Sequence, residues 1–444
     1  MLSDTFFKRL WLVILQILCF CFSLSFAFAQ NKQSLHTRQT SQNPPYYSRQ
    51  QATVASDKHY AIQPDFSFTA LSLTIDRSAT FEGAYVIVGQ DTFFLREDEH
   101  LAEEDPFKHS GLLIFDTPQT TFAFFSASIR GNVSFSLINA ESGRGKANAR
   151  MQESKKQRHS DQNVSCQPPE MIRTSVWREG LPEPAYNRIE TNVRHVIVHH
   201  SAGSNISTDY LNTVRNIYLF HTQDRGWSDV GYNYLIAQDG TIFQGRSYSD
   251  DQADNDDVQG AHFCGQNSGT MGICMMGNFN TAVPSDTSIT SLIRLTAWKL
   301  DKESLNPLAS SSHPANSNLG VIAGHRNGCA TECPGDNLYA MLEDIRLETE
   351  AYLEAGCQDE EEEPLAFQVY PIPTDGQLNI SLPPEQIPEA IWLIDAAGNK
   401  FSVQAYLDQE EGIWMMETYG LATGVYILQI SGDDFEQTRK LLIH

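Results

Sequence analysis

Positive charge is scarce in this sequence. Its 444 residues include 31 Lys and Arg against 55 Asp and Glu, which gives a formal net charge of −24. A protein that binds nucleic acid needs a basic face to neutralise phosphates, so this balance argues against that function. The same deficit disfavours attachment to an anionic membrane surface. Hydrophobic residues nevertheless make up 41% of the chain, enough to build cores in several domains.

Long apolar runs are absent after the first thirty residues. Lys8 and Arg9 precede an apolar run over residues 10–28, which ends in an Ala-Phe-Ala pattern. This order predicts a signal peptide over residues 1–29 that is cleaved before Gln30. An uncleaved membrane anchor is the alternative, because the run is nearly long enough to span a bilayer. After cleavage we expect a soluble protein outside the cytoplasm, with no stable membrane span.

Several common catalytic signatures are missing. The sequence has no G-x-S-x-G turn for a nucleophilic serine and no glycine-rich phosphate loop. His195 and His199 are spaced as in a metalloprotease helix motif, but the glutamate is absent and the β-branched residues between them favour a strand. A zinc finger would need a second closely spaced ligand pair, which is also absent. The chemistry must therefore come from another arrangement.

Composition divides the N-terminal half into segments. Residues 30–61 are rich in Gln, Ser, Thr and Tyr, which is typical of a disordered leader. Residues 62–140 contain short β-branched and aromatic runs separated by Gly, Asp and Pro, so we predict a small antiparallel β-sandwich. Glycan binding and a spacer role are both open for it. Residues 141–165 are polar without an apolar period, which indicates a linker.

Residues 166–357 mix strand and helix patterns, and they predict an α/β domain with a mixed sheet flanked by helices. Buried strands are expected at residues 193–200 and 269–279, with a hairpin turn at Asp239-Gly240. Helices are expected around residues 210–222, 291–305 and 337–355. The whole chain is thus expected to be multidomain, with this domain between two β-rich ones.

Three residues of the central domain form a candidate metal site. His199 ends a predicted buried strand, and His325 and Cys333 lie in one loop with glycines and a proline. Zinc catalysis needs three rigid ligands of these types and one open position. A histidine and a cysteine at this spacing are a weak pattern by themselves. Cys333 has the alternative of a disulfide bond, and Cys329 lies close by.

The segments around these residues resemble the family of peptidoglycan recognition proteins and phage-lysozyme-type N-acetylmuramoyl-L-alanine amidases. The matching segments, in order, are IRTSVW (172–177), VIVHHSAG (196–203), RNIYLFHTQDRGWSDVGYNYLIAQDGTIFQGR (215–246), GAHFCGQNSGTMGICMMGNF (260–279) and GHRNGCATECPGDNLY (324–339). The resemblance implies a zinc-dependent amidase that hydrolyses the bond between the lactyl group of N-acetylmuramic acid and L-alanine in bacterial peptidoglycan. A non-catalytic peptidoglycan-binding protein of the same fold is the alternative, although such members typically lose the cysteine ligand. A surface adhesin is a third interpretation.

Site residues follow from this resemblance by position. His199, His325 and Cys333 are implied to bind Zn²⁺. Tyr232 matches the catalytic tyrosine, which would stabilise the developing oxyanion or relay a proton, and Thr331 stands where family members have threonine or lysine. The expected lining of the substrate groove, with a structural role as the alternative for its histidines, is His200, His221, Trp227, His262 and Asn278.

The acidic loop over residues 250–257 is expected to be solvated, with a calcium site as the alternative. Ser247-Tyr248 stands where many family members have a Gly-Trp segment, so the preference for diaminopimelate or lysine in the stem peptide is open. Sequence alone leaves disulfide connectivity open. The favoured pairs are Cys166 with Cys357, which bracket the domain, and Cys264 with Cys329, and Cys274 is expected to be a buried free thiol.

An acidic linker over residues 358–364 leads into a β-rich segment, residues 365–444. This segment resembles the C-terminal sorting domain of type IX secretion substrates. The matching residues are Tyr370, Pro371, Pro373, Thr374, Gly376, Asp395, Gly398, Gly424, Val425 and Tyr426. The resemblance implies a small β-sandwich read by the type IX secretion machinery, and export through the periplasm of a Gram-negative bacterium to the surface or medium. An ordinary accessory β-domain is the alternative.

Overall fold

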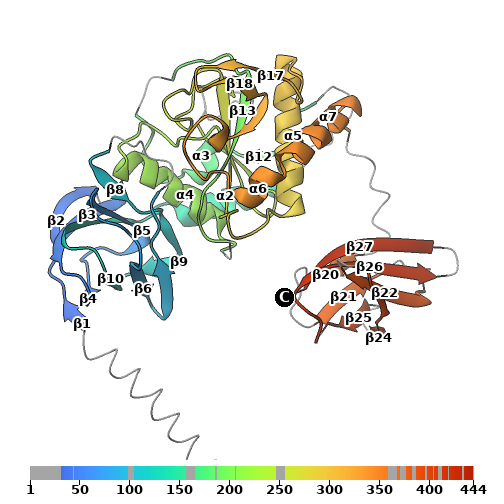
Figure 1. Ribbon diagram of the computed structural model, residues 1–444, viewed down its shortest axis with the longest axis horizontal. Helices are drawn as coiled ribbons and strands as arrows, with labels where there is room; N and C mark the ends of the chain where they lie inside the picture. Colours follow the sequence, from blue (N-terminus) through green and yellow to red (C-terminus); the bar gives the residue numbers. More distant parts are fainter. Residues whose placement is uncertain are drawn as a thin grey trace, which may run out of the picture. The chain divides into compact units, whose positions relative to one another are not determined.

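The computed structural model of the protein is shown in Figure 1. It describes residues 32–443 except 44, 99–104, 157–165, 186–187, 206, 247–255, 359–367, 371–376, 383–386, 396–397, 404, 409–412, 419 and 433–434. The expected signal peptide and most of the acidic linker lie outside the described residues. The chain divides into two compact units, Met1–Cys357 and Gln358–His444. No helix of the described part is long and apolar enough to cross a bilayer.

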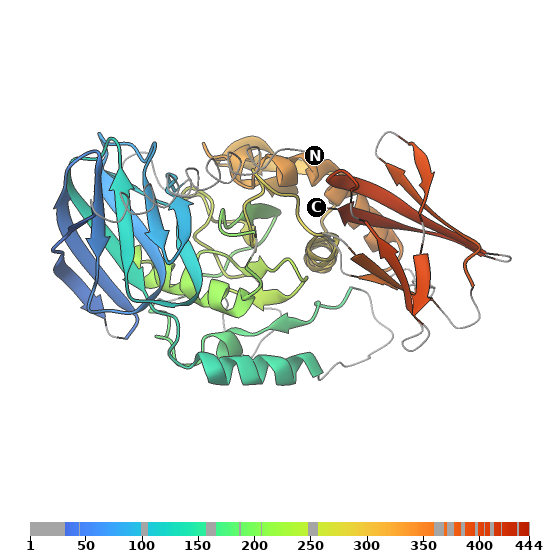
Figure 2. The same ribbon diagram turned by 90° about the horizontal axis from the view of Figure 1, so that it is seen from below.

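The first unit begins with two β-sheets around one hydrophobic core. One sheet has the order β1 (Lys32–Ser34), β4 (Lys58–Ile62), β10 (Phe122–Ser126), β6 (Tyr85–Val88) and β7 (Asp91–Phe94). The other has the order β2 (Arg38–Asn43), β3 (Tyr47–Val54), β11 (Gly131–Ile138), β5 (Phe68–Asp76) and β8 (Phe107–His109), with β9 (Leu113–Gln119) also paired to β5. Figure 2 shows the two sheets, drawn in blue to cyan, as two layers. Below, residues 32–140 are called the β-domain.

The predicted disordered leader is wrong over the described residues, because β1 to β4 lie within or overlap it. Strand β3 pairs with β11 from Tyr47, opposite Ile138, to Val54, opposite Gly131. Every second residue at the end of β3 is buried, including Ala52 and Val54, while polar side chains point outward. The few apolar residues are sufficient because the partner strands supply most of the core. The pairing of β3 with β11 was not predicted, because a composition rich in Gln and Ser is typical of disordered segments.

The predicted linker is also wrong in its first half. Helix α2 (Arg144–Lys156) occupies it. Ala147 and Met151, one helical turn apart, are buried in a core that they share with α3 (Thr174–Trp177) and its neighbours. Because only these two apolar side chains lie on its buried face, the helix shows no repeating pattern of apolar residues in the sequence. Residues 157–165 lie outside the described part.

The central domain contains a six-stranded mixed sheet. Its order is β12 (Met171–Ile172), β15 (Ile242–Gln244), β14 (Tyr234–Ile236), β16 (Thr270–Met275), β13 (His195–His200) and β19 (Ile322–Gly324). All neighbours are parallel except β14 and β15, which form the predicted hairpin. The mixed sheet and the strands expected at residues 193–200 and 269–279 are therefore confirmed.

Helices cover both faces of this sheet. Helix α4 (Tyr210–Leu219), which continues as the π-helical turn η1 (Phe220–Asp224), packs on one face against Leu235 and Cys274. Helix α5 (Asp286–Glu303) and α7 (Leu342–Glu354) pack on the other against Tyr234 and Ile273. The helix expected around residues 337–355 is divided into α6 (Asp336–Ala340) and α7. A hairpin of β17 (Ser310–His313) and β18 (Asn316–Gly320) was not predicted.

Both favoured disulfides are present. Cys166 is bonded to Cys357, which joins the two ends of the central domain, and Cys264 is bonded to Cys329. Cys274 is a buried free thiol, as predicted.

The second unit contains two four-stranded sheets. One has the order β20 (Gln368–Tyr370), β21 (Gln377–Ser381), β25 (Ile413–Glu417) and β24 (Ala405–Asp408). The other has the order β23 (Lys400–Ser402), β22 (Ala390–Asp395), β26 (Gly424–Gly432) and β27 (Phe435–Ile443). Leu378 and Met416 of the first sheet and Leu393 and Leu428 of the second share one core.

Candidate metal centre

The sheet brings two histidines together at the carboxyl ends of neighbouring strands. Strands β13 and β19 run in parallel, and Val198 lies opposite Gly324. His199 follows Val198, and His325 follows Gly324, so both side chains start from the same edge of the sheet. The rings of His199 and His325 lie 4.5 Å apart between centroids. Both residues are buried.

The third donor comes from the loop after β19. Cys333 is fully buried and its thiol is free, because the neighbouring Cys329 is bonded to Cys264. Sγ of Cys333 lies 3.6 Å from Nδ1 of His199 and accepts a hydrogen bond of 3.3 Å from the backbone N–H of His200. The alternative of a disulfide at Cys333 is therefore excluded.

This donor set fits zinc. One ligand atom each from His199, His325 and Cys333 lies within 4.8 Å of the other two. A tetrahedral zinc ion with N and S ligands at about 2.0 and 2.3 Å holds an N and an S about 3.5 Å apart. The 3.6 Å between Nδ1 of His199 and Sγ of Cys333 matches that separation. Two imidazoles and a thiolate are typical zinc ligands, and a fourth position is left for water or substrate.

His199 is oriented by a chain of hydrogen bonds behind it. Its Nε2 lies 3.0 Å from Nδ1 of His262, whose Nε2 lies 3.3 Å from the Thr270 hydroxyl. That hydroxyl donates to the Asn267 carbonyl at 2.8 Å, so it accepts from the His262 ring. His262 then accepts from His199, which leaves Nδ1 of His199 unprotonated toward Cys333. Burial lowers the pKa of His262 to about 3, so this ring stays neutral.

His262 was expected in the substrate groove, and the structure places it behind the metal ligands instead. Its ring fills the space left by two glycines. A Cβ atom at Gly260 would lie 2.4 Å from the ring, and a Cβ atom at Gly272 would lie 2.5 Å from it. The hydrogen bond between His262 and His199 therefore could not be predicted from the expected position of His262 in the groove. The conserved chemistry of zinc sites, in which a ligand histidine donates its other N–H to a second group, was the only available hint.

Tyr232 lies beside the three ligands. It precedes β14, and its ring centroid is 5.2 Å from that of His199. The side chain is almost fully buried, and burial raises the pKa of its hydroxyl well above the ordinary value. The hydroxyl also shares a hydrogen bond with the Cys274 thiol. A phenol that stays protonated at neutral pH is a hydrogen-bond donor.

Two other expected site residues have structural contacts. The Thr331 hydroxyl accepts a hydrogen bond of 3.0 Å from the backbone N–H of Cys333, which shapes the ligand loop. His200 is fully buried, and its Nδ1 accepts from the backbone N–H of Phe279 at 3.2 Å. His200 therefore holds the loop after β16 and does not line the groove.

A cleft of about 500 Å³ opens beside Tyr232. Three of the five expected groove residues, His221, Trp227 and Asn278, line it. His221 stacks near Trp227 at 4.6 Å between centroids, and its Nδ1 accepts from the backbone N–H of Gly231 at 3.1 Å. The cleft also has lining residues from the β-domain, which the sequence analysis did not associate with the site.

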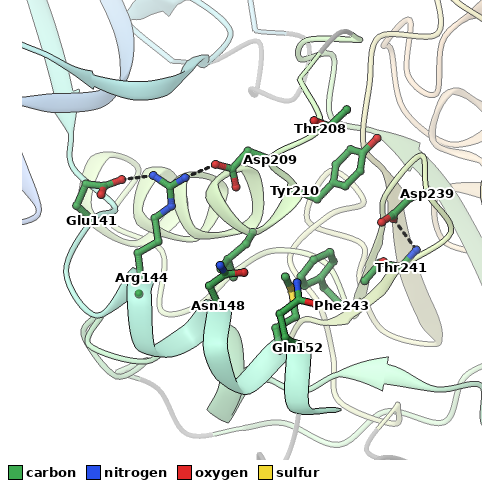
Figure 3. A pocket seen from close by; sticks show the side chains of 13 residues that line it. Glu141, Arg144, Asn148, Gln152, Thr208, Asp209, Tyr210, Asp239, Thr241 and Phe243 are labelled. Atoms are coloured by element: carbon green, nitrogen blue, oxygen red, sulfur yellow. Dashed lines mark hydrogen bonds and ion pairs between the residues drawn. The ribbon is translucent and has the colours of Figure 1, made fainter. Parts of the chain in front are cut away.

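A second cavity of about 600 Å³ lies between α2, the start of α4 and the β14–β15 hairpin (Figure 3). Arg144 points into it and forms ion pairs with Glu141 and Asp209. Neither Tyr232 nor any of the three metal ligands lines it. Its charged lining consists of Arg144 and the three carboxylates of Glu141, Asp209 and Asp239, and it is separate from the candidate metal centre.

A second cluster of potential ligands, Asp256, Asp257 and Glu303, surrounds a lysine instead of an empty site. The fully buried ammonium group of Lys299 forms ion pairs with all three carboxylates. Asp256 and Asp257 are the described end of the acidic loop, and the expectation of a solvated loop is wrong at Asp256, which is fully buried against Lys299. Residues 247–255, with Ser247-Tyr248, lie outside the described part.

Comparison with known proteins gives two family matches. The N-acetylmuramoyl-L-alanine amidase family matches residues 189–336, and the secretion system C-terminal sorting domain matches residues 368–444. The first range contains Tyr232 and the three metal ligands. The β-domain lies outside both ranges.

Individual proteins resemble the chain over about the same extent. Peptidoglycan-recognition protein SC2 of Drosophila simulans is 33% identical over 171 residues, which cover 38% of this chain and 82% of that protein. Peptidoglycan recognition protein 1 of Mus musculus is 31% identical over 177 residues, which cover 39% of this chain and 86% of that protein. The solved endolysin N-acetylmuramoyl-L-alanine amidase LysCS of Clostridium intestinale is 27% identical with a TM-score of 0.29, covering 38% of this chain and 90% of that one.

Proposed function

This chain belongs to the family of peptidoglycan recognition proteins and N-acetylmuramoyl-L-alanine amidases, and we propose that it is a zinc-dependent amidase. The bond that it hydrolyses in this proposal joins the lactyl group of N-acetylmuramic acid to L-alanine of the stem peptide. The observation that carries the proposal is the convergence of His199, His325 and Cys333, whose ligand atoms lie within 4.8 Å of one another.

The residues of the site have different roles in the proposed reaction. His199, His325 and Cys333 hold the metal, and His262 keeps His199 in the tautomer that presents Nδ1. When bound, zinc supplies a Lewis acid that lowers the pKa of water and polarises a carbonyl group. The protonated hydroxyl of Tyr232 donates a hydrogen bond to the negative charge that develops on the amide oxygen.

The shape of the site supports a long substrate. Trp227 and Asn278 line the cleft together with Tyr232, so a peptide or sugar can lie against them next to the residue that contacts His199. Thr331 holds the Cys333 loop through the 3.0 Å bond to the Cys333 N–H. In this proposal Thr331 positions the ligand, and any contact that it makes with the substrate is secondary.

A peptidoglycan-binding protein without catalysis is the rival function in this family. A cysteine ligand is dispensable for binding alone, yet Cys333 is present as a buried free thiol facing His199. This observation favours the hydrolase.

The second unit carries a sorting domain of a secretion system. We propose that it directs the protein through the type IX pathway, across the periplasm and outer membrane of a Gram-negative bacterium. The enzyme would then act at the cell surface or in the medium.

Mass spectrometry of digested peptidoglycan sacculi tests the hydrolase. The purified zinc-loaded chain is expected to release peptides with a free N-terminal L-alanine and to leave the glycan strands intact. A chelator and the substitution His325→Ala should each abolish this release, whereas His59→Ala in the β-domain should not change it. Full zinc occupancy without any release would show the binding-only function, and release that persists in chelator would exclude the zinc mechanism.

A further inference from the structure

The cleft beside the metal centre has one wall from each domain of the first unit. Tyr232, Trp227 and Ala330 belong to the central domain. The opposite wall comes from the turns and short strands of the β-domain around β8, and its lining side chains are Arg77, Arg96, Glu97, Asp98, Phe107, Lys108, His109 and Leu112. The β-domain lies outside the amidase family match, so this wall is a property of this chain.

The wall is held rigidly because the two domains share a buried polar joint. The Asp224 carboxylate, at the end of η1, is fully buried. It accepts hydrogen bonds from Arg49 at 2.7 Å and Tyr47 at 2.9 Å, and also from the hydroxyls of Ser72 and Ser136. A single carboxylate of the central domain thus bonds to three strands of the β-domain, β3, β5 and β11.

Further contacts extend this joint to the cleft itself. Arg225 forms an ion pair of 2.7 Å with Asp98, and both side chains are less than 10% exposed. Thr69 donates to Asn216 of α4 at 2.7 Å. Apolar residues of the two domains, among them Ile138 with α4, form one continuous core. A satisfied buried polar network makes the surrounding structure more rigid, so we expect the β-domain residues to keep their place over the cleft.

The β-domain wall carries three cationic side chains, Arg77, Arg96 and Lys108, and two carboxylates, Glu97 and Asp98. Lys108 is paired with Glu97 at 3.2 Å, and Arg225 with Asp98. Arg77 donates to the backbone carbonyl of Asp105. Within the described part of the chain, no carboxylate forms an ion pair with the exposed side chains of Arg77 and Arg96. The guanidinium groups of Arg77 and Arg96 can therefore bind an anionic group of a ligand in the cleft.

We propose that the β-domain is the second half of the substrate-binding site, and that Arg77 and Arg96 bind free carboxylates of the stem peptide. Carboxylates match the planar fork of donors that a guanidinium presents. The exposed ring of Phe107 and the side chain of Leu112 offer apolar contact for the aliphatic parts of the same peptide. The identity of this ligand rests on the proposed function, whereas the shared cleft does not.

Binding measurements on the full chain test the proposal apart from catalysis. The probes are a muramyl tripeptide with free carboxylates on its second and third residues, and the same molecule with carboxamides there. Titration in the presence of a chelator prevents cleavage. The wild type should bind the free-carboxylate probe about tenfold more tightly than the carboxamide, because a charge-assisted hydrogen bond is lost in the latter.

Two variants give the decisive comparison. Arg77→Gln combined with Arg96→Gln should remove the preference for carboxylates, while Arg38→Gln, an exposed arginine of β2 outside the cleft, should keep it. A double variant that retains both affinity and preference would overturn the proposal, as would a wild type that binds the two probes equally. Either result would leave the hydrolase function intact, since that function is decided by zinc-dependent release from sacculi.

Discussion

Nδ1 of His262 lies 3.0 Å from Nε2 of His199, on the side of the His199 ring that faces away from Cys333. In the proposed zinc site the His199 ring therefore has Nδ1 for the metal and Nε2 for its buried neighbour. Because the neighbour stays neutral and is itself bound to Thr270, the proton on the His199 ring is confined to Nε2. The pair links the geometry of the metal centre to the packing behind it.

Removing this neighbour should weaken metal binding. His262→Ala takes away the acceptor for Nε2–H of His199, and loss of such a partner typically costs 10- to 100-fold in metal affinity. Zinc affinity measured by competition with a chromophoric chelator checks this. The control is His313→Gln, since His313 is a buried histidine of the same domain that contacts none of the metal ligands. Equal zinc affinity in His262→Ala and wild type would contradict the orienting role.

Tyr232→Phe should separate catalysis from metal binding. The substitution removes only the hydroxyl, so zinc content should be unchanged while kcat falls about 10²- to 10³-fold, as for loss of one oxyanion donor. Steady-state hydrolysis of a soluble muropeptide with parallel metal analysis measures both. Tyr234→Phe, two residues along and on the opposite face of the sheet, is the matched control. Full activity in Tyr232→Phe would assign the hydroxyl to packing.

The joint between the two domains should be a large contributor to stability. Asp224→Ala leaves Arg49 and Tyr47 without their shared acceptor, and loss of one partner from such a buried charged group costs about 3 kcal/mol. Urea unfolding followed by fluorescence measures the change in the free energy of unfolding. Glu82→Ala, at an exposed position of the same β-domain, should change it by less than about 0.5 kcal/mol. A loss of that small size for Asp224→Ala would mean that this carboxylate contributes little to the joint.

Asp229 should make stability depend on pH. It is 2% exposed, and burial raises its pKa to about 6, above the value of 3.8 that it has in the unfolded chain. The folded state therefore holds its proton more tightly between about pH 4 and 6, and the free energy of unfolding falls as pH rises through that window. Above it, the buried charge costs up to about 3 kcal/mol.

The substitution Asp229→Asn keeps the acceptor for the Val230 N–H and removes the charge. We expect it to raise the free energy of unfolding at pH 7.5 and to leave it nearly unchanged at pH 3.5. Thermal or urea unfolding at the two pH values checks the difference. An increase in the free energy of unfolding of equal size at both pH values would show that the effect is unrelated to the ionisation of Asp229.

Much of the central domain could be predicted because its signals are local. The β-branched run before His199 marks a buried strand, and Asp239-Gly240 marks a tight turn, which the structure has at those positions. The division of the last helix at Met341 was missed, since the residues on both sides are good helix formers. The contacts of His200 and His262 with backbone and ring neighbours were also beyond reach, because a buried histidine and a groove histidine look alike in sequence.

By itself the sequence determined the kind of chemistry: two histidines and a cysteine in segments of the amidase type, a nearby tyrosine, and a C-terminal sorting segment. Donor type and strand periodicity are properties of short segments, so they can be read one residue after another. Only the tertiary structure decided that Cys333 is free while Cys329 is bonded, and that Arg77 and Arg96 lie over the same cleft as Tyr232. Those relationships depend on strand pairing and domain packing between residues 65 or more positions apart, so no short segment of the sequence shows them.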